Sequence, residues 1–193
     1  MAADPEQLRA WLTARSLARG LPPPVEEFGG LRVDTNSDKE VRRWVFAEVV
    51  PGIAQLAHSI REQRNFIKLC GTEAEVREVL CQRWAIQSGS WFMALGSGPP
   101  AAEPLPGGYL LERMHNGSVT GVEIRTEEGE LAASGFAAET PQAFVYDRIE
   151  TDAAHRRRGL GRAVMAALGS SRQSPPARQL LMATAEGEKL YSS

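Results

Sequence analysis

A run of arginines and glycines at 156–162 has the residue types best suited to a chemical task. Gly159 and Gly161 allow the backbone to come close to a ligand. A helix that begins here presents amides without intrahelical partners, with the positive end of its dipole behind them. Mobile positive charge around the turn comes from Arg156, Arg157, Arg158 and Arg162. The segment therefore predicts a phosphate-binding turn.

The elements on either side of this turn must hold it in place. A strand is expected at 144–150, directly before it, and the apolar run 180–183 predicts a second strand parallel to the first. Between them, one buried helical face is predicted by the spacing of Leu160, Ala163, Val164, Ala167 and Leu168. Gly169 is expected to end this helix in the left-handed conformation. The predicted unit is strand, basic glycine turn, helix, strand.

Neither standard phosphate motif fits, because the P-loop needs Lys-Ser/Thr after a longer glycine spacing and the dinucleotide fingerprint needs a third glycine. Arg156-Arg-Arg-Gly159-Leu-Gly161 instead resembles the central Arg/Gln-x-x-Gly-x-Gly/Ala motif of the GNAT (GCN5-related) N-acetyltransferase superfamily. The segment 183–191, which ends in Leu190-Tyr191, is similar to the last motif of that family. The resemblance covers residues 118–193.

The resemblance implies an α/β fold, with a mixed, mainly antiparallel sheet flanked by helices, and acetyl-CoA as co-substrate without a metal. The backbone of Ile149, Glu150 and Thr151 would pair with the pantetheine arm, and the amides of Arg157–Arg162, Leu160 included, would hold the pyrophosphate. Tyr191 would donate a proton to the departing thiolate. Glu150 is the candidate base, directly or through water, although a charged strand end is more often merely exposed.

Two features depart from the family pattern. Thr184 stands where the family often has asparagine, and threonine can still cap a helix. The family continues past the Leu-Tyr pair with further strands, whereas the sequence ends at Ser193. We therefore expect a domain without its C-terminal strands, or one whose sheet another segment completes.

Three segments are expected along the chain: an N-terminal α/β part at 1–95, a linker rich in proline and glycine at 96–108, and the acetyl-CoA-binding domain at 109–193. The N-terminal part is either a degenerate second copy of the GNAT-like fold, which we favour, or a source of helices for the C-terminal part. Strands at 109–114, 119–124 and 131–136 predict an antiparallel meander.

In the N-terminal part, helices are expected around Leu8–Leu12 and Ile53–Ile60, and strands at 31–33, 66–70 and 91–95. Two capping boxes predict further helices. Ser37–Glu40 would open a helix that contains Val41, Trp44 and Val45, and Thr72–Glu75 would open a helix that ends at Leu80.

Composition narrows the class of function. The chain is 42% hydrophobic and 24% charged, with a net charge of −2, and no apolar run is long enough to span a membrane. No signal segment opens it, and Cys70 and Cys81 predict inert thiols rather than a disulfide framework, so a cytoplasmic setting is expected. His155 is expected to be a polar loop residue.

The expected function is acetyl transfer to a primary amine of a small molecule or peptide, with a homodimer as a possible assembly. A second hypothesis is a non-catalytic, acyl-CoA-binding regulatory module of GNAT fold. A third is a nucleic-acid binder that uses the arginines, but the net charge of −2 and the lack of interleaved aromatic residues oppose it.

Overall fold

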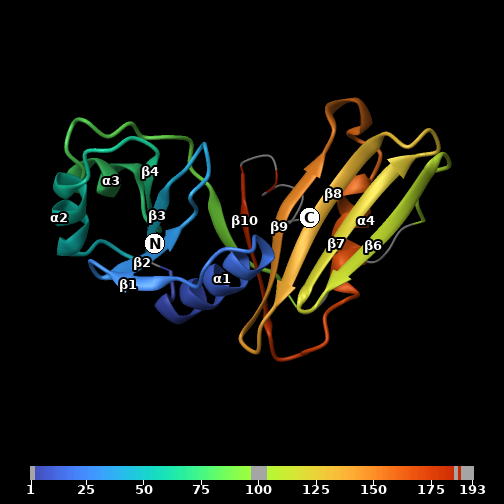
Figure 1. Ribbon diagram of the computed structural model, residues 1–193, viewed down its shortest axis with the longest axis horizontal. Coiled ribbons are helices and arrows are strands. Elements are labelled where there is room, and N and C mark those ends of the chain that lie inside the picture. The colour runs from blue at the N-terminus through green and yellow to red at the C-terminus, as the bar shows by residue number, and fades with distance from the viewer. Residues whose placement is uncertain (1–2, 97–103, 185–186, 188–193) are drawn as a thin grey trace. The chain divides into compact units, whose positions relative to one another are not determined.

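The computed structural model describes residues 3–96, 104–184 and 187 (Figure 1). The chain divides into two compact units, 1–92 and 93–193.

The first unit contains a four-stranded sheet in the order β1-β2-β3-β4. Its strands are β1 (Val25–Glu27), β2 (Gly30–Asp34), β3 (Arg42–Phe46) and β4 (Asn65–Leu69). Pairing is antiparallel from β1 to β3 and parallel between β3 and β4. The helices are α1 (Pro5–Ala18), α2 (Pro51–Ser59) and α3 (Glu73–Val79).

The two faces of this sheet carry different helices, because side chains alternate along a strand. On one face Trp44 and Phe46 pack with Ile53 and Leu56 of α2. The other face carries Val45, which is 1% exposed. This side receives α1, which begins at Pro5 after Asp4 accepts a hydrogen bond from the Glu6 amide at 2.9 Å. The predicted helix around Leu8–Leu12 is therefore confirmed.

The predicted helix after Ser37 is wrong, because that segment forms β3. The Ser37 hydroxyl does accept a hydrogen bond from the Glu40 amide at 3.0 Å, as in a capping box. The backbone amide of Ser37 donates to the Glu40 carbonyl at 2.8 Å, which closes a tight turn instead. Pairing of β3 with strands on both sides then outweighs the local helix signal.

The second capping box is confirmed. The Thr72 hydroxyl accepts from the Glu75 amide at 3.2 Å, and the Glu75 carboxylate accepts from the Thr72 amide at 2.6 Å. The helix α3 follows directly.

A six-stranded sheet, ordered β5-β10-β9-β8-β7-β6, forms the body of the second unit. Its strands are β5 (Trp91–Ala94), β6 (Tyr109–Asn116), β7 (Val119–Thr126), β8 (Leu131–Glu139), β9 (Ala143–Thr151) and β10 (Arg178–Ala183). The strands β6 to β9 form the predicted antiparallel meander, and β10 pairs parallel to β9. The predicted α/β fold with a mixed, mainly antiparallel sheet is confirmed.

The helix α4 (Leu160–Gly169) lies across one face of this sheet (Figure 1). Leu160, Val164 and Leu168 are at most 1% exposed and pack with residues of β7, β8 and β9. The predicted left-handed end at Gly169 is wrong: Gly169 is the last helical residue and is buried, and Ser170 follows in the right-handed conformation.

The two units share one arrangement of strands. In the first, β2 and β3 are antiparallel, and α2 connects β3 to the parallel strand β4. In the second, β8 and β9 are antiparallel, and α4 connects β9 to the parallel strand β10. The prediction that residues 1–95 are a degenerate copy stays a prediction, and this shared order supports it.

Candidate active site

The turn between β9 and α4 is built to expose helix amides. After β9 the chain makes the short 3-10 helix η1 (Ala153–His155), and Gly159 then precedes α4 at φ 77°, in the left-handed region. No side chain caps α4. A Cβ placed on Gly159 would meet nothing within 4 Å, so the space beside the first-turn amides is open. Open space, the amides of a first helical turn and a helix dipole together suit an anion.

The arginines of the turn surround this opening with positive charge. Arg156, Arg157 and Arg158 are exposed, and Nε of Arg156 donates to the carbonyl of Thr151 at 3.4 Å. Arg157 has φ 64°, a conformation that costs a residue with a Cβ about 1 kcal/mol. Arg162 lies one turn along, on the exposed side of α4. The structure thus brings together the residues that the motif predicts.

A hydrogen-bonded group that the sequence did not indicate orients Arg158. Nη1 of Arg158 donates to the hydroxyl of Tyr109 at 2.9 Å, and that hydroxyl lies 2.9 Å from Nδ1 of His155. Nε2 of His155 lies 3.6 Å from the Glu130 carboxylate. The expectation of a polar loop residue at 155 is wrong, because His155 is only 8% exposed. No sequence signal links Tyr109 to the turn, since the strand that carries it lies far away along the chain.

The edge of β9 opens next to this turn. The parallel pairing of β9 with β10 extends from Ala143 to Tyr146, whose partner is Leu181, and β9 then continues to Thr151 paired with β8. In the described part of the chain no strand pairs with the opposite edge of Ile149–Thr151. The backbone groups at that edge are available to an extended ligand.

An irregularity in β9 marks the same place. Pairing with β8 shifts between Ser134 and Phe136, so that β9 bulges at Arg148, where φ is 53°. The guanidinium of Arg148 lies 4.0 Å above the ring of Phe136. A bulge bends its strand and redirects the side chains that follow. It also leaves little space: a Cβ on Gly135 would lie 2.6 Å from Cδ1 of Ile149.

A buried hydrogen bond holds β9 and β10 together just where their pairing ends. The Tyr146 hydroxyl donates to Oε1 of Gln179 at 2.6 Å, and Nε2 of Gln179 donates to the carbonyl of Gly96 at 3.2 Å. Burial raises the pKa of Tyr146 to about 12, so the hydroxyl stays a donor at any physiological pH.

The predicted catalytic side chains are less well defined than the turn. Glu150 is exposed, and its backbone lies opposite Ser134 of β8. Asp147 is 9% exposed and lies 3.3 Å from Nε of Arg148. Tyr191 and its neighbour Leu190 lie outside the described residues.

The equivalent turn of the first unit cannot hold a phosphate in the same way. It joins β3 to α2 through 47–50, without arginines. A Cβ on Gly52, the second residue of α2, would lie 1.9 Å from the carbonyl oxygen of Phe28, so backbone fills the space beside the first turn of this helix. The turn at 156–162 is the better phosphate site of the two.

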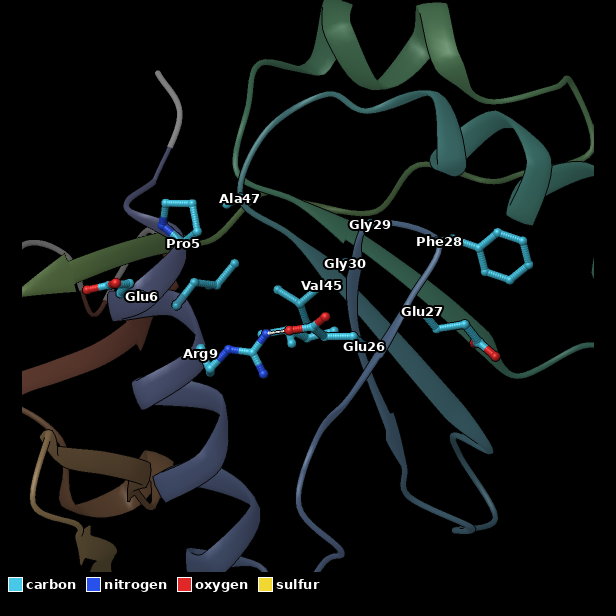
Figure 2. A pocket seen from close by; sticks show the side chains of 12 residues that line it. Pro5, Glu6, Arg9, Glu26, Glu27, Phe28, Gly29, Gly30, Val45 and Ala47 are labelled. Carbon is cyan, nitrogen blue, oxygen red and sulfur yellow. Dashed lines mark hydrogen bonds and ion pairs between the residues drawn. The ribbon is translucent and has the colours of Figure 1, made fainter.

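The first unit has a hollow of its own, of about 550 Å³, between the start of α1 and the β1–β2 hairpin (Figure 2). This volume would suit a small ligand. Three of its charged groups, Arg9, Glu26 and Glu27, already have protein partners, however. Arg9 pairs with Glu26, and Glu27 accepts from Arg32 at 2.9 Å and from the indole of Trp44 at 2.6 Å. We place the candidate site at the turn, where the space beside Gly159 is open and the arginines are exposed.

Comparison with known proteins now adds to this geometry. No protein-family model and no curated protein sequence matches the chain. A GCN5-related N-acetyltransferase from Kribbella flavida superposes with a TM-score of 0.56 at 12% identity, over 93% of this chain and 86% of that one. The fold is that of the GNAT acetyltransferases. A Drosophila protein of known structure superposes at 0.54 with 16% identity, over 85% of this chain and 68% of that chain.

The superposition establishes the GNAT fold. Identities this low do not establish an activity, which depends on the residues of the site. Within 3–96, 104–184 and 187, no group of three His, Cys, Asp or Glu side chains is arranged to hold a metal. None of the helices described is long and apolar enough to cross a membrane.

Proposed function

We propose that this protein transfers an acetyl group from acetyl-CoA to a primary amine of a small molecule or peptide. One observation carries the proposal: the uncapped N-terminus of α4, opened by Gly159, adjoins the unpaired edge of β9. A coenzyme with a pyrophosphate at one end of an extended, amide-containing arm matches both features.

In this proposal the first-turn amides of α4 and the surrounding arginines bind the pyrophosphate. The two amides of the pantetheine arm pair with the backbone of Ile149–Thr151, as an added strand would. This arrangement puts the thioester at the unpaired edge of β9. A backbone amide near Thr151 would stabilise the oxyanion that forms when the amine attacks.

The acceptor must reach the thioester carbonyl as a neutral amine, so an ammonium must first lose a proton. Glu150 is the base we propose, directly or through a water molecule, because it lies one residue before the end of β9 and is exposed to solvent. Tyr191 is the proton donor we propose for the departing thiolate, on the strength of the Leu190-Tyr191 match.

A second candidate function is that of a regulatory module that binds acyl-CoA without transferring the acyl group. The observation that favours it is that Glu150, the proposed base, is exposed to solvent. Calorimetry with CoA combined with a thiol-release assay over a panel of amines separates the two. Binding with release supports the transferase, binding without release across the panel supports the module, and absence of binding rejects both.

A further inference from the structure

Lys68 is an unusual residue in this chain, which has only three lysines: Lys39, Lys68 and Lys189. It lies in the middle of β4 and pairs with Val45 of β3. Residues that pair across a sheet share a face, so its side chain lies on the Val45 side, which α1 covers. Lys68 is half-buried, whereas Lys39 is exposed in the turn before β3.

The charges around Lys68 are mostly positive. Arg43 on β3 and Arg15 and Arg19 at the end of α1 all disfavour its ammonium form. Arg15 is itself 5% exposed, with its guanidinium 5.6 Å from the centroid of the Trp11 ring. Three arginines therefore converge on this lysine from two elements.

Only one carboxylate acts in the opposite direction, and it is already engaged. Glu40 favours the ammonium form of Lys68, but both its oxygens bind Arg43, the first at 2.9 Å from Nε. Among the described residues, Nζ of Lys68 has no hydrogen-bond or ion-pair partner. Burial, followed by the charges of Arg43 and Arg15, lowers the pKa of Lys68 to about 8.

Cys70 is a further titratable neighbour, two residues along the chain and just past the end of β4. Burial raises the pKa of this thiol, while Lys68 lowers it. Because burial is the larger cause, the thiol stays protonated where the amine is already partly neutral. We therefore expect the amine to be the reacting group of this cluster.

We propose that Lys68 is a covalent modification site that accepts acyl groups from acyl thioesters. The nitrogen lone pair attacks the thioester carbonyl carbon, a C–N bond forms, the C–S bond breaks, and the thiolate takes up the proton released by nitrogen. The product is a neutral amide, so modification removes a charge that the arginines disfavour. The reaction needs only a thioester in solution and does not rest on the turn at 156–162.

The three arginines have a second effect, on the donor. Acyl-CoA molecules carry several negative charges, and a positive cluster raises the local concentration of such an anion. An uncharged donor gains nothing from this. Comparison of the two kinds of donor therefore separates intrinsic reactivity of the amine from attraction of the donor.

The test compares Lys68 with Lys39 in the same molecules. The full chain is treated briefly with acetyl-CoA, or with uncharged N-acetoxysuccinimide, at about pH 7.5, and acetylation at each lysine is measured by peptide mass spectrometry. We expect Lys68 to react roughly tenfold faster than Lys39 with the uncharged reagent, because its lowered pKa leaves more of the amine neutral, and by a larger factor with acetyl-CoA. Equal or slower reaction of Lys68 would overturn the proposal.

Two variants make the test specific. Arg43→Gln removes one cation and releases Glu40 to pair with Lys68, so the preference for Lys68 should fall several-fold in a variant whose circular dichroism is unchanged. An undiminished preference would contradict the role of the cluster. In Gly159→Glu the preference should persist; its loss would show that the transferase site delivers the acetyl group, which overturns direct reaction while supporting the proposed function.

Discussion

The Tyr109 hydroxyl lies 2.9 Å from Nη1 of Arg158, although 49 residues separate them in the chain. The first strand of the meander thereby restrains an arginine of the phosphate turn. A flexible arginine loses side-chain entropy when it binds an anion. Because Tyr109 restrains Arg158 in advance, part of that loss has already occurred in the free protein.

We therefore expect Tyr109→Phe to raise the Kd for CoA roughly fivefold, the effect of one hydrogen bond worth about 1 kcal/mol. A double-mutant cycle, measured by calorimetry, tests whether Tyr109 affects CoA binding through Arg158. If Tyr109 acts through Arg158, the Tyr109→Phe/Arg158→Ala variant binds no more weakly than Arg158→Ala alone. Additive losses would mean that Tyr109 acts by another path.

A carboxylate introduced at Gly159 should abolish CoA binding. Gly159→Glu puts negative charge into the open space beside the α4 amides, and we expect the Kd to rise at least a hundredfold. Gly129→Glu is the matched control, because Gly129 also has a positive φ (89°) and open surroundings but lies in the β7–β8 turn. Both variants bear similar backbone strain, so a loss confined to position 159 identifies the phosphate site. Gly161→Glu should resemble Gly159→Glu.

Gly135 allows α4 and the β9 bulge to approach one strand closely. A Cβ there would lie 2.6 Å from Cδ1 of Ile149 and 2.7 Å from Cγ1 of Val164. Gly135→Ala should lower the free energy of unfolding by roughly 1–3 kcal/mol, measured by urea denaturation. Adding Ile149→Val removes the nearer atom and should recover part of the loss. If stability does not recover, the contact with Val164 and not the one with Ile149 causes the destabilisation.

Removal of the Tyr146 hydroxyl should weaken the junction of β9 and β10. Tyr146→Phe leaves Oε1 of Gln179 without its buried donor, at a cost of roughly 1–3 kcal/mol in urea denaturation. The folded-state pKa of about 12 lies above the usual value of 10.0, so the native protein should lose stability as the pH rises between these values. Tyr146→Phe should not lose stability over this pH range. If it does, a group other than Tyr146 causes the pH dependence.

Replacing Lys68 should stabilise the protein in a pH-dependent way. Its pKa of about 8 in the folded state lies below the ordinary 10.5, so the native state releases the proton first and stability rises with pH between those values. Lys68→Met should be more stable than the parent below pH 8, by roughly 1–2 kcal/mol once partial exposure is allowed for. Lys39→Met is the control. An advantage that persists unchanged above pH 10.5 would contradict this cause.

The sequence pattern was sufficient to predict structure where the interactions that stabilise a segment lie within that segment. The motif at 156–161 predicts the glycine turn because only a residue without a Cβ adopts φ 77° readily, and the apolar spacing from Leu160 predicts the face of α4. The box at Thr72–Glu75 predicts α3 for a similar reason, since both its hydrogen bonds are made within one turn. At Ser37 the same kind of signal failed, because strands on both sides of β3 compete with it.

The turn at 156–162, with its glycines and its arginines, is what the sequence alone determined, since backbone conformation and local charge depend on neighbouring residues. Tertiary structure decided the rest, by bringing together groups that are far apart in the chain. It set Tyr109 against Arg158, ended the pairing of β9 with β10 at Tyr146, and gathered three arginines around Lys68. Hydrogen bonds, burial and electrostatic interactions of this kind depend on distance in space, which a linear pattern does not contain.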